Sequence, residues 1–201
     1  MIEIPQGVLD NIARKQFEIG GKMPLAWTLS AESLKRAADL VFDQAESAYK
    51  RNFDSTLQRT KIASSGTYTL SAEEEMDLHD TRLFNVYGLL MGYAIENLAK
   101  GVLVARDPGH ISKEGQFKLT NHDIRSLVEN VLGTISNEEG DVLDLLETYV
   151  LWVGRYPIPR KWTDIDMNRC QIQRYQEIIA DLYIRLLSTL TTYRGRPIAA
   201  P

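Results

Sequence analysis

A polar stripe lies within the most apolar segment of this 201-residue chain. Asn85, Glu96 and Lys100 share one side of a helix predicted over residues 72–105. Ionisable pairs on a mostly apolar helix need partners, and they therefore tend to gather at functional sites. We expect Glu96 to line a groove and Lys100 to hold or orient its carboxylate. The alternative is a structural i,i+4 pair within a tight helix–helix contact, worth about 0.2–0.5 kcal/mol.

Two glycines lie on the same side of this helix, at Gly88 and Gly92. Glycine costs about 1 kcal/mol in a helix interior relative to alanine. Their spacing therefore indicates close approach by another helix or by a ligand. A third possibility is a structural oligomer, in which this face would be buried against a symmetric partner.

The segment 152–162 combines three basic and three aromatic residues with two prolines. Prolines stiffen the backbone, arginine binds phosphate through two parallel hydrogen bonds, and aromatic rings stack on bases. Arg155, Tyr156 and Arg160 are therefore candidate anion-binding residues that would face Glu96 across a groove. The alternative is a rigid connector whose tryptophans complete the core.

Other catalytic chemistry has little support in the sequence. The three histidines, His79, His110 and His122, form no H-E-x-x-H or E-x-x-H motif, and there is no Walker loop and no G-x-G-x-x-G. The single cysteine, Cys170, excludes a disulfide framework and any zinc site of several cysteines. We expect no metal and no cofactor. His122 is interpreted as a surface residue in the first turn of a helix, although it could act as a base.

The elements that position these residues are helices. Ser71-Ala-Glu-Glu74 and Ser136-Asn-Glu-Glu139 are capping boxes, and no alternating strand pattern appears. We predict an all-α fold, a bundle of four to five main helices with a long central helix at about 72–105. Helices are expected over 6–19, 31–52 (capped by Ser30), 72–105, 122–132 (capped by Thr120 or Asn121), 137–153 and 164–193 (capped by Thr163), with a loop over 54–70.

Charge is distributed unevenly along the chain, whose net charge is −4. Residues 1–154 carry 15 basic and 23 acidic side chains, whereas residues 155–201 carry 8 basic and 4 acidic ones. An anionic partner is therefore favoured at the C-terminal segment. The N-terminus shows no signal-peptide pattern, and charges interrupt the apolar segment 83–105, so we expect a cytoplasmic protein without a membrane span.

The stretch Gly92-Tyr-Ala-Ile-Glu-Asn-Leu-Ala-Lys-Gly101, followed by His122-Asp-Ile-Arg-Ser-Leu127, resembles the HEPN superfamily. These are helical bundles of prokaryotic toxin–antitoxin, phage-defence and RNA-processing systems. Their long second helix carries a Glu-x-x-x-Lys/Arg element, which Glu96 and Lys100 match. The resemblance implies a bundle over 71–193, an N-terminal helical extension and loop over 1–70, and a tail over 194–201.

The ribonuclease members of that superfamily also carry Arg-x(4–6)-His near the start of a later helix. Arg155 and Arg160 stand near the expected place, but no histidine follows His122. The resemblance therefore implies a dimeric module that binds RNA, a nucleotide or an antitoxin-like protein partner without the usual ribonuclease histidine. The alternative is a metal-independent endoribonuclease toxin that uses His110 or His122.

Overall fold

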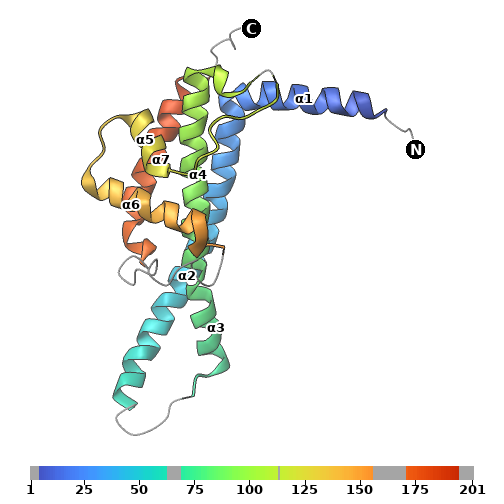
Figure 1. Cartoon of the computed structure of the whole chain (residues 1–201). Helices are drawn as coiled ribbons and strands as arrows, with labels where there is room; N and C mark the ends of the chain where they lie inside the picture. The colour runs from blue at the N-terminus through green and yellow to red at the C-terminus, as the bar shows by residue number, and fades with distance from the viewer. Residues whose placement is uncertain (1–4, 63–68, 113, 156–170, 195–201) are drawn as a thin grey trace.

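The computed structural model describes residues 5–62, 69–112, 114–155 and 171–194, and helices dominate these residues. It confirms the all-α class and the bundle around a long central helix (Figure 1). The elements are α1 (Gln6–Lys22), α2 (Pro24–Ile62), α3 (Ala72–Thr81), α4 (Leu83–Arg106), η1 (Pro108–His110), α5 (Ile124–Leu132), α6 (Asn137–Thr148), η2 (Tyr149–Val153), η4 (Ile172–Tyr175) and α7 (Gln176–Thr191).

The predicted central helix is formed by α3 and α4, which are separated only by Arg82. Its capping box is confirmed, because the Ser71 side chain accepts from the Glu74 backbone N–H and the Glu74 carboxylate accepts from the Ser71 N–H. α4 is buried on most of its surface, which explains its apolar composition. Within the described residues, the helical stretch 72–106 has the length and hydropathy of a membrane span. However, 67% of its most apolar window is buried in the bundle, which makes it weak evidence for one.

The second helix is much longer than predicted. α2 begins at Pro24 rather than at residue 31, and the expected loop at 54–62 is helical. Ser30 lies inside α2, where its hydroxyl accepts a hydrogen bond from the Asn97 side chain instead of capping a helix. Proline is tolerated in a first helical turn, so Pro24 starts the helix without a serine cap.

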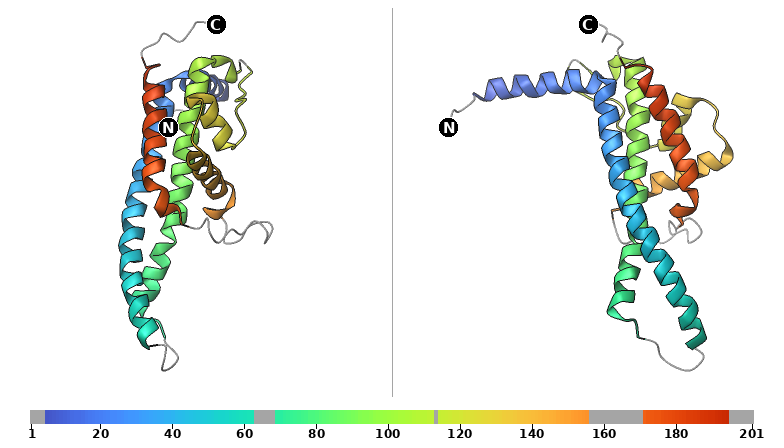
Figure 2. Two further views of the ribbon diagram at one scale, coloured as in Figure 1. Left: turned by 90° about the vertical axis from the view of Figure 1, so that its left-hand side faces the viewer. Right: turned by 180° about the vertical axis from the view of Figure 1, so that it is seen from behind.

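α2 runs beside α4 and shares its core through Ala31, Ala38, Phe42 and Ala45 (Figures 1 and 2). Within the segment predicted as an N-terminal extension, residues 1–70, α2 thus contributes to one hydrophobic core with the bundle. Beyond the bundle, α2 and α3 continue as a projecting helical hairpin (Figure 1).

α5, α6 and α7 pack on other sides of α4. The Ser136–Glu139 capping box of α6 is confirmed, and the predicted helix 137–153 ends in the π-helical turn η2. α5 begins two residues later than predicted and is capped by Asp123, not by Thr120 or Asn121. The predicted start of the last helix, including Thr163, lies outside the described residues.

Candidate functional site

Glu96 and Lys100 form a buried ion pair on α4. Their side chains are 5% and 6% exposed, and Lys100 Nζ lies 2.6 Å from Glu96 Oε1. The helix places them four residues apart on one face, as their spacing predicts. Their burial distinguishes this pair from an ordinary surface pair, because two desolvated charges depend on each other.

His122 completes the cluster from another part of the chain. Its Nδ1 lies 3.0 Å from Oε1 and 3.1 Å from Oε2 of Glu96. An ionised carboxylate only accepts hydrogen bonds, so Nδ1 carries the hydrogen and, in the neutral ring, Nε2 is left as an acceptor. The His122 side chain is 44% exposed, so the cluster reaches the surface through this ring.

The connector between α4 and α5 positions the histidine. Asp107 accepts from the Gly109 N–H in the first turn after α4, and Ile111 and Phe117 form an antiparallel bridge within the connector. The Phe117 ring contacts Trp27 of α2, and Lys100 Nζ lies 5.7 Å from its centroid. These contacts hold the connector against α2 and α4, and the connector then places His122 next to Glu96.

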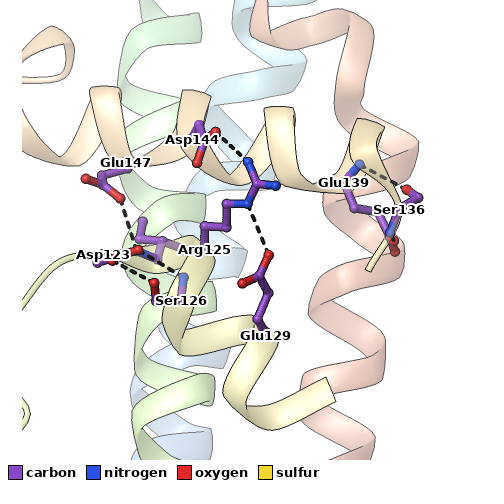
Figure 3. A network of polar contacts seen from close by, with 9 residues as sticks. Asp123, Arg125, Ser126, Glu129, Ser136, Glu139, Asp144 and Glu147 are labelled. Carbon is purple, nitrogen blue, oxygen red and sulfur yellow. Dashed lines mark hydrogen bonds and ion pairs between the residues drawn. The ribbon is translucent and has the colours of Figure 1, made fainter. Parts of the chain in front are cut away.

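The start of α5, directly after His122 in the chain, is held by hydrogen bonds of Asp123 and Glu147 (Figure 3). Asp123 caps the helix by accepting from the Ser126 N–H and hydroxyl, and these hydrogen bonds lower the pKa of the Asp123 carboxyl. The Glu147 carboxylate of α6 accepts from the Ile124 N–H at 3.2 Å. Burial raises the pKa of Glu147, and the neighbouring carboxylates add to this effect.

An arginine ties α5 to α6 behind this cap. Arg125 donates to Glu129 at 3.1 Å and to Asp144 at 2.9 Å (Figure 3). Gly140 allows the approach, because a Cβ there would lie 2.8 Å from the Arg125 guanidinium carbon. Arg125 is therefore used in packing α5 against α6.

Arg155, the first basic residue of the segment 152–162, also reaches α4. The exposed Arg155 donates a hydrogen bond to the Tyr93 hydroxyl, and its guanidinium lies 5.5 Å from the Tyr93 ring centroid. Gly154 packs against α4 one turn earlier, where its Cβ would lie 2.5 Å from that of Leu89. Tyr93 precedes Glu96 by three residues, so both contacts fall on neighbouring positions of one helix.

The glycine face of α4 is covered by the chain itself. A Cβ at Gly88 would lie 2.7 Å from the Tyr149 ring, and one at Gly92 would lie 2.6 Å from a Val150 methyl. The glycines therefore admit η2 against α4, as the close-approach interpretation predicts. The purely structural oligomer, which would bury this face against a symmetric partner, loses its interface.

The structure brings together only some of the sequence-predicted site residues. Glu96 pairs with Lys100, and Arg155 reaches the same helix. Asn85 lies eleven residues before Glu96, about 16 Å along the helix axis, near the start of α4. Tyr156 and Arg160 lie outside the described residues. The interpretation of His122 as an ordinary surface residue missed its bond to Glu96, because nothing in the local spacing links positions 26 residues apart.

Comparison with known proteins adds no relative. No family model, curated protein or solved structure matches this chain. Among the described residues, no group of three or more histidine, cysteine, aspartate or glutamate side chains has a geometry that could hold a metal ion.

Proposed function

We propose that this chain is an HEPN-like helical module that binds RNA or a nucleotide, in a prokaryotic defence or toxin–antitoxin setting. The observation that carries the proposal is the contact of Arg155 with the Tyr93 hydroxyl, beside the buried Glu96–Lys100 pair. This contact places Arg155, the first basic residue of the segment 152–162, against the helix that bears the HEPN-like element.

The chemistry of this contact suits a phosphate with a neighbouring base. Arg155 is exposed, and its guanidinium, which donates one N–H to the Tyr93 hydroxyl, has further donors for phosphate oxygens. The Tyr93 ring is partly exposed, and aromatic rings bind bases by stacking, worth about 1–3 kcal/mol per base. The net positive charge of the segment that Arg155 opens favours the same anionic ligands.

The test measures fluorescence anisotropy of a labelled single-stranded oligoribonucleotide at low and high salt, with a mononucleotide as competitor. Arg155→Ala should weaken binding about 10- to 150-fold, since a charge-assisted hydrogen bond contributes about 1.5–3 kcal/mol. It should also lower the salt slope by about 0.7 for each phosphate that the protein no longer neutralises. Displacement of the oligoribonucleotide by the mononucleotide would show that the site binds a single nucleotide.

Lys50→Ala is the matched control, because it removes an exposed positive charge from the distant hairpin. Its affinity and salt slope should equal those of the wild type. The proposal fails if the wild type binds neither ligand, or if the control loses as much affinity as Arg155→Ala.

The hydrogen bond between His122 and Glu96 favours a second candidate, a metal-independent endoribonuclease. A carboxylate that holds one ring nitrogen leaves the other oriented as a proton acceptor, the arrangement that general bases use. His122 Nε2 would take the proton of a ribose 2′-hydroxyl as its oxygen attacks the adjacent phosphorus. The 5′ oxygen of the next nucleotide would leave and take a proton from water, and a 2′,3′-cyclic phosphate would form.

RNA degradation separates the two candidates. If His122 is the base, the wild type cleaves, whereas His122→Ala and Glu96→Gln lose cleavage while oligoribonucleotide binding at Arg155 persists. Intact RNA after incubation with the wild type removes the ribonuclease candidate for the RNAs tested and leaves the binding proposal standing.

A further inference from the structure

The π-helical turn η2, which ends α6, is wound more widely than an α-helix. The Gly154 N–H donates to the carbonyl of Tyr149, five residues before it, at 3.1 Å. An α-helix instead closes each hydrogen bond over four residues. Turns closed over five residues are rare and occur mostly as single turns in α-helices, frequently at functional sites. Arg155, the arginine of the proposed binding site, directly follows this turn.

η2 contacts α4 through residues that are five positions apart. Tyr149 packs over Gly88, where a Cβ would lie 2.7 Å from the Tyr149 ring. Gly154, five residues after Tyr149, packs against Leu89, the next residue of α4. A turn closed over five residues explains this pattern, because it brings the first residue and the sixth onto the same side of the segment.

The following residues repeat the pattern. Val150 packs over Gly92 of α4, and Arg155, five residues after Val150, donates to the hydroxyl of Tyr93, the residue after Gly92. In both pairs, a step of five residues in η2 corresponds to a step of one residue in α4. The contacts therefore define one register between η2 and α4, and the hydrogen bond from Arg155 to Tyr93 belongs to it.

A regular α-helical turn would break this register. At about 100° per residue, a residue five positions further on is rotated by about 140°, so Arg155 would leave the side that faces α4. Gly154, four residues after Val150, would then lie beside Tyr93, and it has no side chain that could hold a ligand. Arg155 therefore reaches Tyr93 because the turn is closed over five residues.

The sequence favours the wider turn at the position of Gly154. A Cβ on Gly154 would lie 2.5 Å from the Cβ of Leu89, closer than real Cβ contacts in proteins. In an α-helical turn Val153, four residues after Tyr149, would face Leu89 instead, and its branched Cβ does not fit the same space. The glycine thus permits the wider turn, and the valine opposes the α-helical one.

We propose that η2 is the positioning element of the phosphate site, and that its π-helical register, which requires Gly154, places Arg155 on Tyr93. The inference rests on the proposed function, because the ligand is the RNA or nucleotide whose phosphate Arg155 binds. Gly154 is a positioning residue, since it acts on the ligand through Arg155. A phosphate held at Tyr93 requires this register.

Changing the number of residues in η2 tests the register. One alanine inserted after Leu151 puts Arg155 six residues after Val150, and neither an α-helical nor a π-helical turn returns it to Tyr93. Oligoribonucleotide affinity should then fall about 10- to 150-fold, as expected for Arg155→Ala, with unchanged helicity by circular dichroism. Deletion of Leu151 makes the spacing four, so an α-helical turn restores the contact and affinity should stay within about 2-fold of the wild type.

Leu151→Ala is the matched control for both variants. Leu151 is 49% exposed, and the substitution keeps the spacing of five residues. Its affinity should equal that of the wild type. Wild-type affinity in the insertion variant would overturn the proposal, and so would a deletion variant that loses as much affinity as the insertion variant.

Gly154→Ala tests the register through a single atom. The new Cβ would lie 2.5 Å from that of Leu89, so η2 must move off α4 and affinity should fall although Arg155 is intact. Gly20→Ala is its control, because nothing lies within 4 Å of a Cβ at Gly20. Wild-type affinity in Gly154→Ala would contradict the role of the glycine.

NMR measures the register without any ligand. A nuclear Overhauser effect between Gly154 and the Leu89 side chain is expected in the wild type, and none is expected in the insertion variant. A contact of Val153 with Leu89 in its place would show an α-helical turn and refute the register. The Gly154–Leu89 contact in a protein that binds neither the oligoribonucleotide nor the mononucleotide would refute the proposed function but support the register.

Discussion

The buried pair Glu96–Lys100 makes the sharpest prediction about stability. In Glu96→Gln the Lys100 ammonium, 6% exposed, loses its counter-charge, and breaking a buried pair costs about 3–5 kcal/mol. The nearby Phe117 ring offsets part of this through a cation–π contact. We therefore expect a loss of about 3 kcal/mol, which at a urea m-value of about 2 kcal/mol/M lowers the midpoint by about 1.5 M.

Lys100→Met should cost less than Glu96→Gln. The Glu96 carboxylate then keeps the hydrogen bond from His122, and a hydrogen bond to a charged group contributes about 1.5–3 kcal/mol. A loss of about 2 kcal/mol follows. The double variant Glu96→Leu/Lys100→Met leaves no buried charge on α4, and it should lie within about 1 kcal/mol of the wild type.

Urea unfolding followed by circular dichroism at 222 nm measures all three variants. The expected order of midpoints is the wild type and the double variant highest, then Lys100→Met, then Glu96→Gln. If both single variants unfold within about 0.3 M of the wild type, the pair is not desolvated as described. A double variant less stable than either single variant would refute the reasoning that uncompensated charge causes the loss.

Three further outcomes are expected at the helix contacts. Gly92→Ala should destabilise the protein by about 1–3 kcal/mol in urea unfolding, because the new Cβ would lie 2.6 Å from a Val150 methyl and overpacking outweighs the better helix propensity. Glu139→Gln should cost about 1 kcal/mol near pH 7, and its unfolding curve should converge with that of the wild type in acid. The Ser136 N–H and the Arg185 guanidinium lower the pKa of Glu139, so its stabilisation is present above its usual range near 4.5 and is lost as pH falls through the lowered value. Glu147→Gln should raise the neutral-pH midpoint slightly, because burial raises the pKa of this carboxyl and disfavours its charged form.

Local sequence signals predicted the helix starts that are stabilised by hydrogen bonds between residues close in sequence. The capping boxes at Ser71 and Ser136 mark helix starts correctly, because the hydrogen bonds that define them join residues three apart. The same logic failed at Ser30, a good capping residue that lies inside α2. Packing of α2 along α4 provides enough stability to continue the helix across it, and tertiary contacts of this kind override local propensity.

In the candidate site too, contacts between residues close in sequence were predictable, and long-range contacts were not. The Glu96–Lys100 pair follows from helical spacing alone, and so does the need of Gly88 and Gly92 for a close neighbour. The identity of that neighbour does not follow, because η2 reaches α4 only through the packing of α6. His122 joins Glu96 through the connector after α4, a long-range contact that no periodicity encodes.

The positions of Tyr93 and Glu96 link the binding proposal to the ribonuclease candidate. They are three residues apart on α4, so Arg155 at Tyr93 and His122 at Glu96 approach neighbouring points of one helix. A phosphate held by Arg155 would therefore lie on the side of α4 where His122 reaches the surface. Buried ion pairs contribute little net stability, and orienting His122 is the role that the ribonuclease candidate gives to Glu96 and Lys100. The double variant Glu96→Leu/Lys100→Met tests this role directly. It should fold and bind RNA at Arg155, yet lose any cleavage that depends on His122, whereas unchanged cleavage would show that the pair does not orient the ring.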